Sequence, residues 1–218
     1  MGSEVLEGLK AGIRRFRSDV YPARAEMYLK AASEPQDPSA LIVACADSRV
    51  RPETITQSAP GELFVTRNIG NMVPAYGEMM GGVSAVVEFA VMELKVKHIA
   101  ICGHSECGAM KELLGQKSVA ELPAVANWLK NAHTALSVTR ALAEEGEDIN
   151  VFKRRLTEQN VLLQMQHLRT HPSVAGAMAK EELTISGWVY DIGSGEVRIC
   201  EEGGKVFEPV VVEGVVAR

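Results

Sequence analysis

Two continuous apolar runs, each ending abruptly in polar residues, constrain this chain more than any other feature. The first covers residues 40–45 (ALIVAC) and the second covers residues 99–102 (IAIC). Runs of this kind are typical of strands buried on both faces of a parallel sheet. In such sheets, binding sites form beyond the carboxyl ends of the strands, where the strand order reverses. The polar residues that follow the two runs are therefore expected to meet.

The rest of the chain alternates helical and strand patterns. An amphipathic stretch at residues 4–32, interrupted near Tyr21–Pro22, predicts an N-terminal helical arm. A helical period also runs through residues 77–95 and 120–167, and further strand signals cover residues 62–71, 183–192 and 196–202. In the first of these strands we expect Leu63, Phe64 and Val65 to be buried. This alternation predicts an α/β fold with a mostly parallel β-sheet of about four to five strands, with flanking helices and the arm.

Length and composition set outer limits on the function. At 218 residues we expect a single domain, with the arm at residues 1–35, a core with the polar site at 36–115, and a helical region with the last strands at 116–218. The net charge of −5 gives no basic face for nucleic acid. No apolar run approaches the roughly 18 residues of a membrane span. The N-terminus lacks the apolar core of a secretory signal, so a cytoplasmic location is expected.

Three residues beyond the two runs form a candidate metal site. Cys45 ends the first run, and His104 and Cys107 follow the second. We expect His104 and Cys107 on a first helical turn, where a spacing of three residues brings side chains together. Two sulfurs and one imidazole suit Zn²⁺, and three protein ligands leave a fourth position for water or substrate. A His-x-x-Cys pair alone is a weak signal, since most such pairs bind nothing.

The other two cysteines do not fit this site. Cys102 lies within the second run and Cys200 lies in a late strand signal, so both are expected to be core residues. In a large chain of this kind, the four cysteines are not expected to form a disulfide framework.

Asp47 and Arg49 place charge at the edge of the core. We expect Asp47 to accept a hydrogen bond and orient a zinc-bound hydroxide, and Arg49 to hold Asp47 off the metal through a bidentate pair. The alternative interpretation is a structural salt bridge that only shapes the turn.

Three segments resemble the β-class carbonic anhydrases. They are CADSRVRPE at residues 45–53, PGELFVTRNIGNMVP at 60–74 and KHIAICGHSECGAM at 97–110; EQNVLLQMQHLRTHPSV at 158–174 and GWVYDIGSGEV at 187–197 are similar too. The resemblance implies zinc-dependent reversible hydration of CO₂ to bicarbonate and a proton, by attack of zinc-bound hydroxide. It implies one Zn²⁺ per subunit, held by Cys45, His104 and Cys107, with Asp47 and Arg49 as the family's dyad.

The resemblance also implies a substrate pocket and self-association. Gln36 matches a residue that donates to the substrate, typically from the neighbouring subunit of a homodimer or tetramer. Phe64 and Phe89 match positions that line the CO₂ pocket, although ordinary core packing explains them nearly as well. The N-terminal arm would wrap a neighbouring subunit.

One departure from the family pattern favours a subgroup. Allosteric members carry a Trp three residues before the first zinc cysteine, whereas this chain has Ile42. Arg67 and Tyr190 resemble the other two members of that second bicarbonate site, so the set is incomplete. We predict the plant-type, open-site form, in which water rather than Asp47 is the fourth ligand.

Two other functions remain open at this point. The same scaffold can hydrolyse CS₂ or COS, which are isosteric with CO₂. A non-catalytic module is the second alternative, in which Cys45 and Cys107 exchange zinc for a disulfide in redox sensing. The Asp47–Arg49 pair and Gln36 have no role in such a module.

Overall fold

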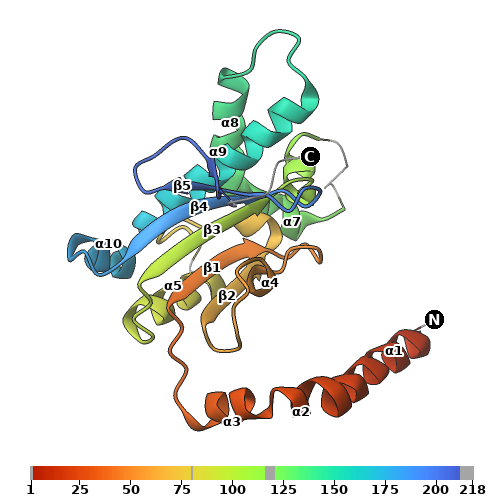
Figure 1. Cartoon of the computed structure of the whole chain (residues 1–218). Coiled ribbons are helices and arrows are strands. Elements are labelled where there is room, and N and C mark those ends of the chain that lie inside the picture. Colours follow the sequence, from red (N-terminus) through yellow and green to blue (C-terminus); the bar gives the residue numbers. More distant parts are fainter. Residues whose placement is uncertain (1, 80, 116–120, 212–218) are drawn as a thin grey trace. The chain divides into compact units, whose positions relative to one another are not determined.

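The protein, described here by a computed structural model, covers residues 2–79, 81–115 and 121–211. The chain forms two compact units, residues 1–37 and residues 38–218 (Figure 1).

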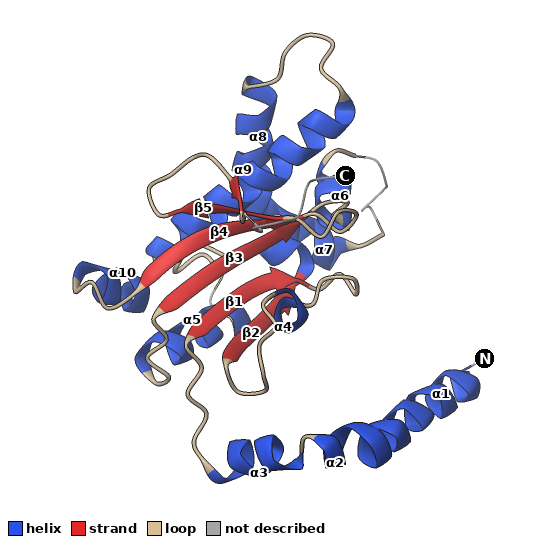
Figure 2. Ribbon diagram, in the orientation of Figure 1, coloured by secondary structure: helices blue, strands red, loops and turns tan. Residues whose placement is uncertain are grey.

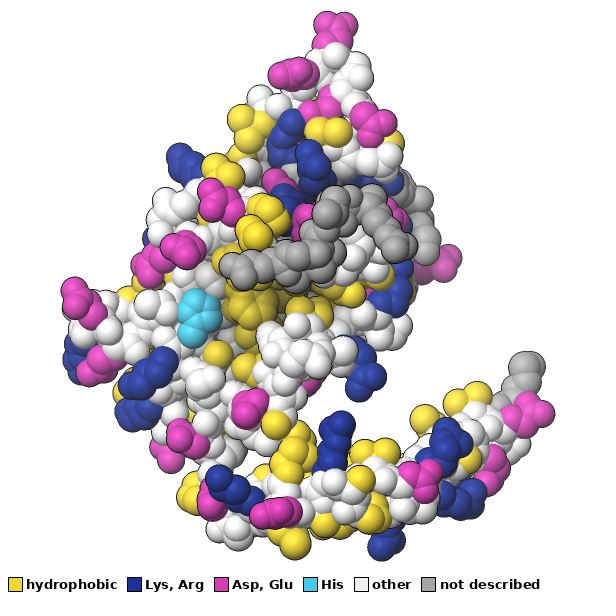
Figure 3. All heavy atoms as spheres, in the orientation of Figure 1, with side chains coloured by type: hydrophobic (Ala, Val, Ile, Leu, Met, Phe, Trp, Pro, Cys, Tyr) yellow, Lys and Arg dark blue, Asp and Glu magenta, His cyan; other side chains and the backbone are white. Residues whose placement is uncertain are grey.

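The first unit consists of consecutive helical segments. They are α1 (Gly2–Arg15), a π-helical turn (Phe16–Val20), α2 (Tyr21–Ala23) and α3 (Ala25–Ser33). The predicted interruption near Tyr21–Pro22 is confirmed, because α2 ends at Ala23 and α3 begins two residues later. None of the described residues of these helices is buried, and hydrophobic side chains are visible along the unit in Figure 3.

The second unit is built on one mixed sheet with the strand order β2-β1-β3-β4-β5-β6. The strands are β1 (Ala40–Cys45), β2 (Leu63–Asn68), β3 (His98–His104), β4 (Thr184–Tyr190), β5 (Val197–Glu201) and β6 (Glu208–Pro209). The first four in spatial order are parallel; β5 then pairs antiparallel with β4, and β6 pairs antiparallel with β5. The predicted α/β class is confirmed. The sheet has more strands than predicted because β6 spans only two residues, too few to give a sequence pattern.

Helices flank this sheet, most of them behind it in the view of Figure 2, with α4 in front. They are α4 (Pro52–Ile55), α5 (Gly82–Met92), α6 (Gly108–Leu113), α7 (Pro123–Leu129), α8 (His133–Ala141), α9 (Ile149–Arg169) and α10 (Pro172–Ala179), with 3-10 turns at Ile69–Asn71 and Lys130–Ala132. Among the described residues, no helix has the length and apolar character needed to cross a membrane.

The central strands β1 and β3 carry the predicted apolar runs and are almost fully buried. Because they are parallel neighbours, Cys45 and His104 end at the same edge of the sheet. β2 and β3 lie on opposite sides of β1, so this edge is a reversal point of strand order.

Two local expectations were wrong. Leu63, Phe64 and Val65 are half-buried rather than buried, because β2 is an edge strand of the sheet. The helix expected from residue 77 begins at Gly82, since Gly81 before it has extended backbone and glycine is a poor helix former. Of the residues expected in that helix, Met79 precedes it and Met80 lies outside the described residues.

The long helix α9 packs closely over β3 and β4 because glycines face it. A Cβ at Gly187 of β4 would lie 2.6 Å from Val161 Cγ1 and 2.8 Å from Met165 Sδ. A Cβ at Gly103 of β3 would lie 2.7 Å from Val161 Cγ2. Distances this short are not tolerated, so the helix would have to move away from the sheet.

We therefore expect Gly187→Ala to destabilise the protein by about 1–3 kcal/mol, the usual cost of overpacking a core. Gly176→Ala is the matched control, because no atom lies within 4 Å of a Cβ there. The control should leave stability unchanged or raise it by up to about 1 kcal/mol, since alanine is the better helix former. Urea unfolding of both variants measures this, and equal midpoints would show that the helix–sheet contact is not tight.

Candidate metal centre

The candidate metal centre lies at the carboxyl edge of β1 and β3. Cys45 is the last residue of β1 and His104 is the last residue of β3. The turn after β3 then brings back Cys107, which is the residue before α6. Three ligand-type side chains from two strands and a turn therefore share one corner of the sheet.

The expectation that His104 starts a helix was wrong. β3 continues to His104 because Gly103 and His104 still pair with Val189 and Tyr190 of β4. Cys107 meets His104 through a tight turn instead, in which Glu106 adopts a φ of 57°. The Ser105 amide donates to the carbonyl of Tyr190 over 2.9 Å, which fixes the turn to β4.

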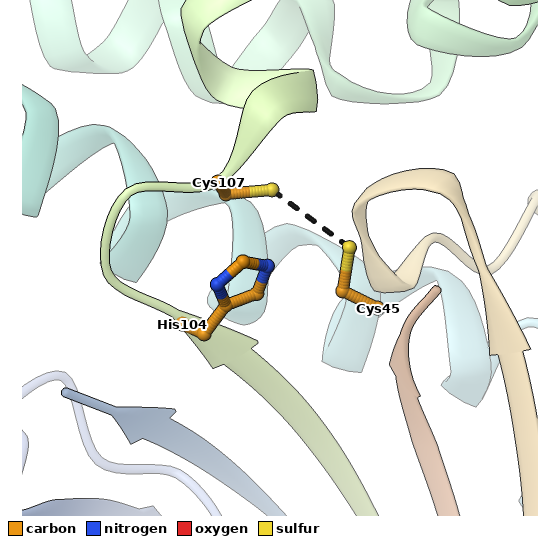
Figure 4. A group of neighbouring side chains, drawn as sticks. All are labelled: Cys45, His104 and Cys107. Atoms are coloured by element: carbon orange, nitrogen blue, oxygen red, sulfur yellow. Dashed lines mark hydrogen bonds between the residues drawn. The ribbon is translucent and has the colours of Figure 1, made fainter. Parts of the chain in front are cut away.

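The three side chains point toward one another (Figure 4). Their ligand atoms all lie within 4.8 Å of one another, and the two sulfurs are 4.0 Å apart. Exposed fractions are 5% for Cys45, 0% for His104 and 3% for Cys107. The cluster is therefore shielded from bulk water by the fold.

The imidazole of His104 is oriented for a cation. Its Nδ1 lies 2.8 Å from the carbonyl of Ser105, so Nδ1 carries a proton and donates it. Its Nε2 is buried and has no hydrogen-bond partner among the described residues. Leaving a buried polar atom unpaired costs about 1–3 kcal/mol. A metal ion bound at Nε2 removes this cost, and the Nδ1–carbonyl contact is the usual outer partner of a metal-binding histidine.

The two thiols are electrostatically coupled. The contact with Cys107 is the largest effect on Cys45 and lowers the pKa of that thiol, against the opposing effect of burial. The same contact, together with burial, raises the pKa of Cys107 above its usual value. Because a metal binds thiolates rather than thiols, a divalent cation here would displace the protons of the pair. Two sulfurs and one imidazole nitrogen fit Zn²⁺.

Asp47 and Arg49 form the predicted bidentate pair beside the cluster. The Arg49 Nε donates to Asp47 Oδ1 over 2.9 Å and its Nη2 donates to Oδ2 over 2.7 Å. These bonds hold the pKa of Asp47 well below its usual range, so the carboxylate stays ionised. Asp47 Oδ2 lies 4.0 Å from His104 Nε2, close to the cluster but outside hydrogen-bond distance of that nitrogen.

Sequence reasoning missed two supports of the site. Arg67 donates to the carbonyl of Cys45 over 3.0 Å and to that of Asp47 over 2.5 Å, so it fixes the turn after β1. The 3-10 turn after β2 is fixed by two distant side chains: Trp128 Nε1 donates to the carbonyl of Ile69 over 2.8 Å, and Asn160 Nδ2 donates to the carbonyl of Gly70 over 3.1 Å. The position of Arg67 near the end of its strand was the one sequence feature that could have indicated its contacts with the turn after β1. A backbone contact between distant segments leaves no sequence signal.

The structure places the predicted pocket residue Phe64 away from the cluster of its own chain. Gln36 is exposed and belongs to the first unit. Phe64 packs against Phe89, with ring centroids 6.0 Å apart. Phe64 lies opposite Leu41 near the start of β1, whereas Cys45 lies opposite Asn68. At about 3.3 Å per residue, Phe64 is roughly 13 Å along the strand from the metal cluster of its own chain.

The remaining cysteines are separate from the site. Cys102 and Cys200 are buried and free, as are the two cysteines of the cluster. Burial raises the pKa of Cys102 to about 12, which keeps it a thiol. The expectation that Cys102 and Cys200 are core residues is confirmed.

Comparisons with known proteins agree with this geometry. A family model described as carbonic anhydrase matches residues 40–197. A carbonic anhydrase of Pseudomonas aeruginosa is 46% identical, over 90% of this chain and 88% of the relative. The solved structure of the β-carbonic anhydrase CcaA superposes with a TM-score of 0.89 at 33% identity, over 96% of this chain and 94% of that one. A structure described among two tetrameric β-carbonic anhydrases of Sordaria macrospora has a TM-score of 0.78 at 30% identity, over 92% and 98% of the two chains.

We expect Cys45→Ala, and separately His104→Ala, to lose metal. Each should weaken Zn²⁺ binding by more than the roughly 10–100-fold that loss of an outer partner costs. Zinc per chain, measured after dialysis against chelators of graded strength, checks this. Cys102→Ala and Cys200→Ala are matched controls that remove buried thiols elsewhere, and both should keep the wild-type zinc content. Unchanged zinc affinity in Cys45→Ala would contradict the assignment.

Proposed function

Because the chain belongs to the β-carbonic anhydrase family, we propose that it hydrates CO₂ reversibly to bicarbonate and a proton at the Cys45–His104–Cys107 cluster, with Zn²⁺ as the cofactor. Hydration of CO₂ is the family's general reaction. The observation that carries the proposal is a buried cluster of zinc-type ligands whose imidazole nitrogen has no partner in the described chain. An ionised carboxylate, Asp47, is held beside this cluster.

Cys45, His104 and Cys107 would hold the metal and leave one position open, as in catalytic zinc sites. When bound, Zn²⁺ lowers the pKa of a coordinated water molecule and so supplies a nucleophile near neutral pH. The two thiolates cancel much of the metal's charge, which makes this effect weaker than with three imidazoles. The protein groups that orient the attacking water therefore contribute more to catalysis than they would at an all-imidazole site.

Asp47 orients the water molecule that attacks CO₂. Its carboxylate is ionised, so it can only accept a hydrogen bond. Accepting the water's hydrogen fixes the direction of the oxygen lone pair that attacks the carbon atom of CO₂. Arg49 keeps the carboxylate in place, and its Nη2 also lies 3.3 Å from the carbonyl of Glu106, in the turn that carries Cys107. The products are bicarbonate and a proton, and the proton passes to buffer.

In the open-site form that we predict, Asp47 would not be a metal ligand, and water would take the fourth position. Arg49 engages both carboxylate oxygens of Asp47, which opposes rotation of Asp47 toward the cluster. Arg67 is already engaged with the carbonyls of Cys45 and Asp47. Ile42 is fully buried where allosteric members of the family have a Trp. All three observations support the open-site form.

A zinc-bound crystal structure near neutral pH tests the open-site form. We expect the Asp47–Arg49 pair to persist, because the bidentate contact and the amide of Arg49 satisfy the carboxylate. A carboxylate oxygen of Asp47 at about 2.0–2.2 Å from zinc would contradict it, since that is a ligand distance.

The substrate pocket is completed by a second copy of the chain. Gln36, Phe64 and Phe89 lie away from the cluster's strand end or in the other unit, so we assign them to the pocket of a neighbouring subunit. The tetrameric relatives of Sordaria macrospora support a homo-oligomer. The exposed apolar residues of α1 also support it, because such a face needs a partner. A cytoplasmic location stays a prediction.

We expect Asp47→Ala to lower the CO₂ hydration rate by about 10²–10⁴-fold, the usual loss when a positioned proton acceptor is removed. Zinc content should be unchanged, because Asp47 is not a ligand in this account. Glu147→Ala is the matched control, since Glu147, in the loop before α9, also pairs with an arginine, Arg155 of α9. Near-normal turnover in Asp47→Ala, measured by stopped flow, would rule out the assigned role. Assays with COS and CS₂ alongside CO₂ establish which substrate is preferred.

A further inference from the structure

A cavity of about 540 Å³ lies between the start of α9, the end of β4 and the start of β5. Its lining includes four buried side chains: Cys107, Met110, Thr157 and Val189. A volume in this range is typical of sites that bind small molecules. Asp47 and Arg49 do not line the cavity, so the proposed hydration of CO₂ makes no use of this space.

Two of the negative groups on the cavity wall are already engaged by other groups of the chain. The carboxylate of Glu106 pairs with Lys111, which also lines the cavity. Oδ1 of Asp191 accepts a hydrogen bond from the amide of Ser194 over 2.8 Å and another from its hydroxyl over 3.0 Å. Neither carboxylate therefore depends on a further cation.

The positive groups on the same wall are not all balanced in this way. Arg198 is engaged, because its Nη1 donates to Glu158 over 2.6 Å and its Nε lies 3.5 Å from the third wall carboxylate, Glu196. Lys153 and Arg154, near the start of α9, make no side-chain hydrogen bond or ion pair with any described residue. The wall thus carries two positive charges that the described part of the chain does not balance.

Two unbalanced cations have a larger effect in a cavity than on an open surface. Walls of low dielectric constant concentrate the field of the charges that line a cleft, and they raise the local concentration of ions of the opposite sign. The amino end of α9 adds to this field, because a helix dipole is positive there. Lys153 is half-buried and lies about one helical turn before Thr157, so the two residues share the face of α9 that lines the cavity.

We propose that this cavity binds a small molecule that carries a phosphate monoester, with the phosphate held by Lys153 and Arg154. Two cations suit a group whose charge is about −1.5 to −2 at pH 7 better than they suit a single carboxylate. Arginine can bind phosphate through two parallel hydrogen bonds, and lysine adds a point charge. The hydroxyl and amide groups of Ser105, Ser194 and Asn150 also line the cavity and can bind the rest of the molecule. Neither cation belongs to the metal centre, so the inference is independent of the proposed activity.

Isothermal titration calorimetry of the full chain, at physiological ionic strength, tests the proposal. Glycerol 2-phosphate is the probe, and acetate is the singly charged comparison. The variants are Lys153→Gln, Arg154→Gln and the double variant, in which each change removes one charge and keeps a polar side chain. The matched control is Lys95→Gln/Lys97→Gln, which removes two exposed lysines just before β3, at the opposite end of that strand from the cavity.

The wild-type chain should bind glycerol 2-phosphate, and it should bind acetate more weakly by about tenfold or more, because acetate lacks the second charge and the additional oxygen. Lys153→Gln and Arg154→Gln should each weaken binding of the probe by about tenfold or more, the effect of losing one hydrogen bond to a charged group. The double variant should lose about a hundredfold. The control should stay within about twofold of the wild type, because charges farther apart than a Debye length are largely screened.

Unchanged binding of glycerol 2-phosphate in the double variant would overturn the inference, because the phosphate would then bind elsewhere in the chain, the metal centre included. No binding by the wild-type chain would overturn it as well. An equal loss of affinity in the control would show that only the net charge of the protein matters, and acetate binding as tight as that of the probe would contradict a phosphate site. The melting temperature of the double variant should equal that of the wild type, which shows that a loss of binding does not come from a disturbed fold.

Discussion

The parallel register between β1 and β3 is the constraint on which the metal centre depends. Ala44 lies opposite Cys102, so Cys45 ends its strand beside the last two residues of β3, which include His104. Successive side chains of a strand point to opposite faces, so a slip of one residue would turn Cys45 away from His104. Burial on both faces holds the register, because alternate residues of β1 belong to two different core clusters.

Burial then makes the polar residues at this corner dependent on one another. A charge taken out of water is costly unless it is paired. Asp47 has Arg49, and the carbonyls of Cys45 and Asp47 have Arg67. Within the cluster itself, Nε2 of His104 is buried and unpaired. A cation at that point completes the pairing, which is why the same arrangement suits both a stable fold and a catalytic metal.

The sequence allowed the ligand set and the sheet to be predicted because both depend on local signals. An apolar run that ends in Cys45, and another that leads to His104, mark buried strands and their polar ends. The turn at Glu106 was missed, since a left-handed conformation at a non-glycine residue is set by tertiary context. The contacts of Trp128 and Asn160 to the Gly70 loop were also missed, because they join distant segments through backbone atoms. The family resemblance supplied Gln36 and the phenylalanines, whose role depends on a second copy of the chain.

The account's central claim is that CO₂ hydration takes place on a metal held by Cys45, His104 and Cys107. Stopped-flow CO₂ hydration, measured while Zn²⁺ is removed by chelation and then added back in known amounts, tests it most directly. The account predicts a rate that disappears with the metal and returns in proportion to bound zinc, up to one ion for each Cys45–His104–Cys107 cluster. A hydration rate independent of zinc content, or no hydration by the fully loaded chain, would contradict it.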